Sequence, residues 1–149
     1  MAGSAKTAAL RFLKLRPRSV SELKEKLEDK GFAAAEIETA VHDLTASGLL
    51  NDRAFTKAFI NYRLARPFGF RRIILELKEK GIDGEIIGQA ITEARENCSP
   101  ENIALDLARR RWQRMPDIDA QKKKKRVLDF LLRRGFEADI AMKVIGELK

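Results

Sequence analysis

The sequence has 149 residues, of which 44% are apolar and 35% charged, and its formal net charge is +8. This length suffices for one domain or a short array of repeats, and abundant Lys, Arg and Glu with few aromatic residues are typical of a helical protein. A single cysteine cannot form an internal disulfide or a cysteine-rich metal site, which favours a reducing compartment. Because no apolar stretch reaches the length of a membrane span, we expect a soluble, cytoplasmic protein without membrane contact.

In chain order, the sequence predicts nine helices in three groups of three. The first helix of each group is predicted over Ala5 to Leu15, Asp52 to Ala65 and Pro100 to Arg114. The starts of the later two carry capping residues, namely Asn51 with Asp52 and Ser99 with Pro100. Ser19, followed three residues later by Glu22, is a capping box for the next helix, which ends near Lys30.

Three glycines, Gly31, Gly81 and Gly135, mark an internal repeat. Each is preceded by a basic residue and followed by an apolar one, and apolar residues stand eight and four positions before it. These apolar positions are Leu23 and Leu27, Ile73 and Leu77, and Val127 and Leu131. Residues at this spacing share one helix face, and glycine ends a helix in the left-handed conformation without penalty. The pattern therefore predicts a helix, a glycine stop, a hydrophobic contact and a second helix, three times over.

This repeat predicts an all-α fold of three tandem three-helix repeats, similar to helix-turn-helix units, over residues 1–50, 51–99 and 100–149. A unit of about 50 residues is small for independent stability. We therefore expect the repeats to depend on their neighbours in an elongated, curved array. The alternative is one compact bundle of nine helices.

The middle repeat carries the most specific motif. It reads Gly48-Leu49-Leu50-Asn51-Asp52-x-x-Phe55, then Arg63, then Gly69-x-x-Arg72-Ile73-x-x-Glu76-Leu77-x-x-Lys80-Gly81-Ile82. The first repeat adds Arg18-Ser19-x-x-Glu22-Leu23-x-x-Lys26-Leu27. Together these motifs resemble the signature of the RecX family, and the resemblance extends over essentially the whole chain.

The resemblance implies a monomeric, non-enzymatic modulator of the RecA recombinase. Members of the family are thought to bind along the groove of the RecA filament, where they block its growth or promote its disassembly. Such binding lowers recombinase and coprotease activity. The resemblance therefore implies negative regulation of homologous recombination, DNA repair and the SOS response, without a cofactor.

Basic residues suggest where a partner binds. The third repeat holds 13 of the 30 basic residues, including Arg109, Arg110, Arg111, Arg114, Lys122, Lys123, Lys124, Lys125 and Arg126. These side chains could contact DNA phosphates or an acidic protein surface, or they could form a solvated face. Four further candidates flank the turn around Pro67, namely Arg63, Arg66, Arg71 and Arg72, although the last two could instead pair with Glu76 and Glu79.

Other features of the sequence argue against catalysis and metal binding. The chain has no glycine-rich phosphate loop and no nucleophile motif, and its one histidine, His42, has no ligand-type residue at metal-binding spacing. Trp112 stands at helical spacing with Leu105 and Ala108, which favours core packing over partner docking. A second hypothesis is direct binding of single- or double-stranded DNA by helix-turn-helix-like repeats. Acidic residues near the predicted starts of the third helices, Glu36, Glu38 and Glu85, argue against it for the first two repeats.

Overall fold

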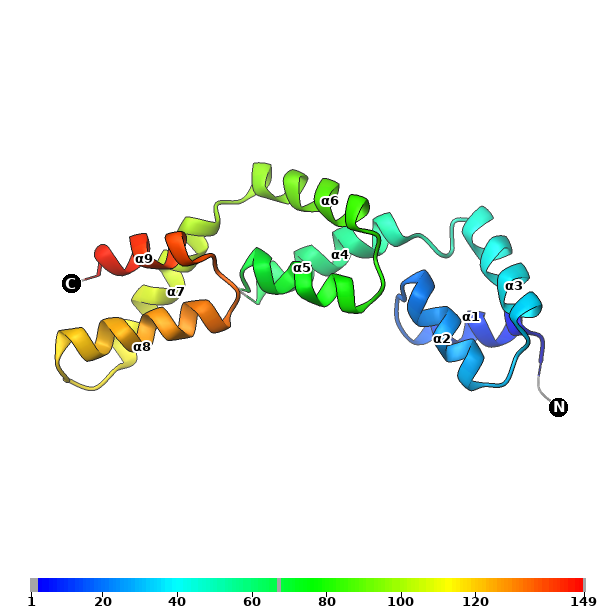
Figure 1. Cartoon of the computed structure of the whole chain (residues 1–149), viewed down its shortest axis with the longest axis horizontal. Helices are drawn as coiled ribbons and strands as arrows, with labels where there is room; N and C mark the ends of the chain where they lie inside the picture. Colours follow the sequence, from blue (N-terminus) through cyan, green and yellow to red (C-terminus); the bar gives the residue numbers. More distant parts are fainter. Residues whose placement is uncertain (1–2, 67, 149) are drawn as a thin grey trace. The chain divides into compact units, whose positions relative to one another are not determined.

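A computed structural model describes residues 3–66 and 68–148. Over these residues the chain forms nine α-helices and no strand (Figure 1). Their bounds are α1 Ala5–Leu15, α2 Val20–Asp29, α3 Ala34–Ala46, α4 Asp52–Ala65, α5 Phe70–Glu79, α6 Gly84–Asn97, α7 Pro100–Arg114, α8 Ala120–Arg133 and α9 Ala138–Gly146. The prediction of an all-α fold with three helices per repeat is confirmed.

The glycine frame explains how α2, α5 and α8 end. Gly31, Gly81 and Gly135 have φ angles of 90°, 76° and 92°, the left-handed region that favours glycine. The amide of the next residue then donates back to the carbonyl of the leucine four residues before the glycine, as from Phe136 to Leu131 at 3.1 Å. All six apolar residues predicted at eight and four positions before the glycines have no exposed surface. The predicted register of the repeat is therefore correct.

The expected caps form at Ser19, Asn51 and Ser99, whereas the Asp52 carboxylate accepts from the Val20 amide instead. The Ser19 hydroxyl accepts from the Glu22 amide at 3.1 Å, and the Glu22 carboxylate accepts from the Ser19 amide at 3.2 Å, which completes the capping box. Asn51 caps α4 through the Ala54 amide, and Ser99 caps α7. The third repeat differs in that α8 has 14 residues where α2 and α5 have 10. This difference of about one helical turn accounts for the spacing of 54 residues between Gly81 and Gly135, against 50 between Gly31 and Gly81.

Packing divides the described residues into two compact units. One contains residues 3–58 and 77–88, and the other contains 59–66, 68–76 and 89–148. In the first unit α1, α2 and α3 pack together around a core that includes Leu23, Leu27 and Leu44. In the second unit α7, α8 and α9 pack around a core that includes Leu131 and Phe136 (Figure 1). Domain boundaries near residues 50 and 99 stay a prediction.

Candidate functional site

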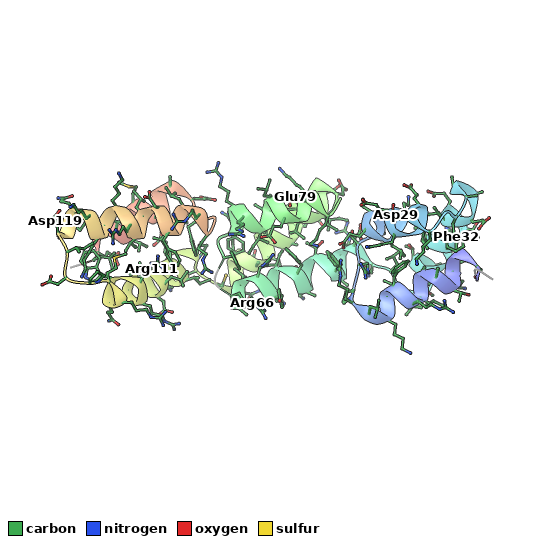
Figure 2. The ribbon with its side chains drawn as sticks, turned by 90° about the horizontal axis from the view of Figure 1, so that it is seen from below. Asp29, Phe32, Arg66, Glu79, Arg111 and Asp119 are labelled. Atoms are coloured by element: carbon green, nitrogen blue, oxygen red, sulfur yellow. The ribbon has the colours of Figure 1, made fainter. Side chains whose placement is uncertain are left out.

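The basic residues selected from the sequence lie on three segments of the second unit. Arg63, Arg66, Arg71 and Arg72 lie on α4, on α5 or in the turn between them; four more lie on α7, and the remaining five lie in the first half of α8. Figure 2 shows Arg66 at the end of α4, Arg111 on α7 and Asp119 just before α8. The surroundings of these side chains differ, and the differences separate internal roles from exposed ones.

Arg63 has an internal role. Its guanidinium forms an ion pair with the Glu76 carboxylate, and the two side chains are only 26% and 16% exposed. The guanidinium carbon also lies 5.4 Å from the centre of the Phe59 ring and 4.9 Å from that of Phe68. Arg63 Nε is buried and has no hydrogen-bond acceptor among the described residues. Arg63 therefore packs within the unit, although the sequence also allowed it to be presented to a partner.

Phe68 is the centre of an arginine cluster. Besides Arg63, the guanidinium carbons of Arg72 and Arg134 lie 4.6 and 5.0 Å from the centre of its ring. Cation–π contacts of this kind favour a guanidinium beside an aromatic face. Arg72 also pairs with Glu76 at 3.2 Å, one turn along α5. Glu76 is therefore shared by two guanidiniums, whereas Arg134 has no ion pair in the part of the chain that the structure describes.

Backbone hydrogen bonds hold the cluster together. The Gly69 amide donates to the Arg134 carbonyl at 2.7 Å, and the Arg71 amide donates to the Gly135 carbonyl at 3.1 Å. A Cβ atom on Gly69 would lie 2.4 Å from the backbone of Gly135, so only glycine allows this approach. The Arg72 side chain adds a bond to the Arg133 carbonyl, and Arg134 adds one to that of Arg66. The turn before α5 is thus joined to the turn after α8.

An equivalent contact lies in the first unit. It is called the first junction, and the contact between the turn before α5 and the turn after α8 is called the second junction. Ser19, which stands 50 residues before Gly69, donates its hydroxyl hydrogen to the Lys80 carbonyl at 2.7 Å. Lys80 and Arg134 each precede a repeat glycine. The Glu22 carboxylate lies between two cations, 3.0 Å from Arg16 and 3.5 Å from Lys80. In both units, therefore, the start of a second helix packs on the glycine cap of the next repeat.

Two carboxylates in this junction have perturbed pKa values. Burial acts to raise the pKa of Glu22, but hydrogen bonds from Arg16 and the Ser19 amide and the charge of Lys80 outweigh it, so the pKa is lowered. For Asp52, burial prevails and raises the pKa, although Asp52 Oδ1 accepts from the Val20 amide at 2.8 Å. The ionised form of Glu22 therefore stabilises the junction, whereas burial disfavours the ionised form of Asp52.

The basic residues of α7 and α8 are more exposed. Arg110 pairs with Asp106 at 3.0 Å, Arg111 lies over Phe130, and the Lys123 ammonium lies 4.7 Å from the centre of the Trp112 ring. The others have no ion pair with a described residue, namely Arg109, Arg114, Lys122, Lys124, Lys125 and Arg126. All of these except Lys124 are exposed. This surface can attract an anionic partner electrostatically.

Sequence reasoning identified the arginines of α4, α5 and the turn between them but missed their partner, Arg134. The only signal for Arg134 was its place before a repeat glycine, which the sequence analysis treated as a feature of the fold. Trp112 packs against the core of the second unit, as predicted. Within residues 3–66 and 68–148, no group of His, Cys, Asp or Glu could hold a metal ion, and no helix is long and apolar enough to cross a membrane.

Comparisons with known proteins cover nearly the whole chain. Sequence models described as the first, second and third three-helix domains of RecX match residues 5–44, 51–91 and 100–145. The chain is 33% identical over 142 residues to Regulatory protein RecX of Legionella pneumophila, covering 95% of this chain and 93% of that protein. It is also 33% identical over 144 residues to the protein of that name from Amycolatopsis mediterranei, covering 96% of this chain and 82% of that protein.

A solved structure agrees with the fold. The crystal structure of RecX from Lactobacillus salivarius is similar with a TM-score of 0.85 and 25% sequence identity. The similarity covers 97% of this chain and 94% of that one. Sequence and fold therefore match one family over the same residues.

Proposed function

This chain belongs to the RecX family, and on that premise we propose that it binds filaments of the RecA recombinase and restrains their growth. The observation that carries the proposal is the share of the chain that matches the family. All three repeats match the family, and the relatives named as regulatory proteins align over 95% of this chain or more. A function of the whole relative can therefore be transferred to the whole chain rather than to one repeat.

The mechanism we propose is steric and needs no catalysis. The protein lies as a monomer in the groove of a filament in the cytoplasm and contacts more than one RecA subunit. Contacts from separate repeats combine through effective concentration, so modest individual contacts give a strong joint affinity. An occupied groove or filament end blocks addition of the next subunit or promotes disassembly, which lowers recombinase and coprotease activity in homologous recombination, DNA repair and the SOS response.

The test is a titration of filament-dependent ATP hydrolysis by RecA. The intact protein should inhibit at fewer than one copy per RecA subunit. A chain cut near Ser99 is poorly suited to comparison with the intact protein, because the cut divides a compact unit. Residues 59–66 and 68–76 belong to the same unit as residues 89–148. Full-length variants are better suited. No inhibition at equimolar protein would contradict the proposal.

A second candidate function is direct, sequence-independent binding of DNA. It is favoured by the exposed basic residues of α7 and α8 that form no ion pair with a described residue, since phosphate contacts need only placed cations. The third helices argue against base reading, because Glu36 and Glu85 lie in the first turns of α3 and α6. Contact with DNA would accordingly come from the phosphate backbone.

This second function is tested by the salt dependence of DNA binding. Lys122→Gln, Lys125→Gln and Arg126→Gln together remove three exposed charges and leave Lys123 on Trp112. Each lost phosphate contact should reduce the slope of log K against log salt by about 0.9 on duplex DNA. A matched control removes three exposed charges of the first unit, at Arg11, Lys14 and Lys26. An equal slope in all three proteins would show that α8 makes no phosphate contact.

A further inference from the structure

The two equivalent junctions differ in the charge of one side chain, which stands at the position between their two outer cations. Arg16 and Arg66 stand 50 residues apart, as do Glu22 and Arg72, and Lys80 and Arg134 each precede a repeat glycine. In the first unit, the Glu22 carboxylate lies between Arg16 and Lys80 and contacts both. In the second unit, the position of this carboxylate is taken by a third cation, Arg72.

The second junction therefore carries uncompensated positive charge. Three guanidiniums gather around Phe68, from Arg63, Arg72 and Arg134, and Arg134 also donates a hydrogen bond to the backbone carbonyl of a fourth arginine, Arg66. Glu76 pairs with Arg63 and Arg72, and neither Arg66 nor Arg134 has an ion pair with any described residue. The start of α5 lies at the same place, and the amino end of a helix dipole adds further positive potential.

Backbone carbonyls and aromatic rings hold the side chains of Arg66, Arg72 and Arg134 in place. Arg134 Nη1 donates a hydrogen bond to the Arg66 carbonyl at 3.4 Å, and Arg72 Nη1 donates one to the Arg133 carbonyl at 3.3 Å. The Arg66 guanidinium carbon lies 3.8 Å from the centre of the Tyr62 ring. Each of these guanidiniums keeps further N–H groups that can donate to an anion. The cluster is thus preorganised by backbone carbonyls and aromatic rings.

From this substitution of an arginine for the carboxylate, we propose that Arg66, Arg72 and Arg134 form a binding site for a phosphate group. A phosphate supplies the negative charge that Glu22 supplies in the first unit, and it accepts several hydrogen bonds at once. Arginine suits this ligand because its planar fork of donors matches the oxygens of a phosphate. The phosphate comes either from a free anion such as pyrophosphate or from a nucleic-acid backbone. Binding of a phosphate at this site does not require RecA.

Calorimetric titration with inorganic pyrophosphate, at constant ionic strength set by chloride, tests the site. The intact protein should give a saturable isotherm with one site. Arg66→Gln and Arg134→Gln should each weaken the affinity at least tenfold. Arg66 is exposed, so its variant should keep the fold even if that of Arg134 does not. The control is Arg11→Gln, which makes the same charge change on α1 and should bind as the unaltered protein does.

A third variant uses the comparison between the junctions. Arg72→Glu places a carboxylate where the first junction has Glu22, and it should abolish pyrophosphate binding while the helix content measured by circular dichroism is retained. Binding that does not saturate, or that falls equally in R66Q and R11Q, overturns the proposal. So does full affinity in R72E.

A single-stranded oligonucleotide then identifies the source of the phosphate. If its affinity also falls tenfold in R66Q, and pyrophosphate competes with it, the site takes a nucleic-acid backbone. If oligonucleotide binding is unchanged in R66Q while pyrophosphate binding is lost, the site takes a free phosphate. Both results support the site, and neither involves RecA, so failure of filament restraint would leave them intact.

Discussion

Leu77 shows how much one repeat position contributes to the fold. It stands four residues before Gly81 and has no exposed surface. We expect Leu77→Ala to lower the free energy of unfolding by about 2–5 kcal/mol, because it removes buried methyl groups and leaves a cavity. Urea denaturation measures this change. The control is Leu75→Ala on the same helix, since Leu75 is 58% exposed and its loss should cost little. Equal costs for the two variants would contradict the register.

Glu22 and Asp52 predict opposite effects of pH on stability. The pKa of Glu22 is lowered on folding, so its ionised form stabilises the fold above the unfolded-state pKa, and this contribution is lost as the pH falls through the folded-state pKa. The pKa of Asp52 is raised, so its contribution increases as the pH falls. Relative to the unaltered protein, Glu22→Gln should therefore lose less stability as the pH falls from about 6 to about 3.

Urea midpoints across this pH range test the prediction, and Asp52→Asn is the matched variant. It should lose stability more steeply than the unaltered protein as the pH falls. Identical pH dependence in both variants would mean that neither carboxylate is perturbed in the folded chain.

At the scale of the helices, the glycine caps differ in what surrounds them. Gly31 and Gly135 have almost the same φ, so an alanine at either position incurs the cost of the left-handed conformation, about 1 kcal/mol. A Cβ atom on Gly31 would meet nothing within 4 Å, whereas one on Gly135 would lie 2.3 Å from Arg72 Cβ. Gly135→Ala should therefore destabilise the protein clearly more than Gly31→Ala in thermal denaturation. Equal losses would indicate that the second junction is open in solution.

The first helix of each repeat could be predicted from the sequence almost residue by residue. The predicted bounds of α1, α4 and α7 are those of the structure, because each begins at a capping residue or shortly after one and carries an apolar face of helical period. These signals are local, so they can be read from neighbouring residues. The glycine ends of α2, α5 and α8 were predictable for the same reason.

The junctions could not be predicted in the same way. The hydrogen bond from the Gly69 amide to the Arg134 carbonyl joins segments 65 residues apart. Because it forms between backbone atoms, the pattern of side chains in the sequence does not indicate it. The internal partners of Arg63 and Arg72 were likewise only partly foreseen, since Glu76 was considered for Arg72 but not for Arg63. The cluster around Phe68 follows from packing between repeats, and only the structure brings Arg134 into it.

At the scale of the whole molecule, the repeat predicts an extended chain. A compact domain of 149 residues has a radius of gyration of about 15 Å. We expect a clearly larger value, because each repeat of a solenoid contacts only its neighbours in sequence. Small-angle X-ray scattering gives this radius directly. A value near that of a compact domain would favour the alternative of a single nine-helix bundle.

The division of α5 between the two compact units affects how the chain opens. Ile73 and Leu77, one turn apart on α5 and both without exposed surface, belong to different units. Backbone amides in the middle of a helix exchange their hydrogens with solvent only when the helix opens around them. In α5, such an opening removes apolar side chains from both units at once. Exchange at these amides therefore reports an opening that exposes buried residues of both units, whereas exchange in α1 or α9 reports an opening that exposes residues of one unit.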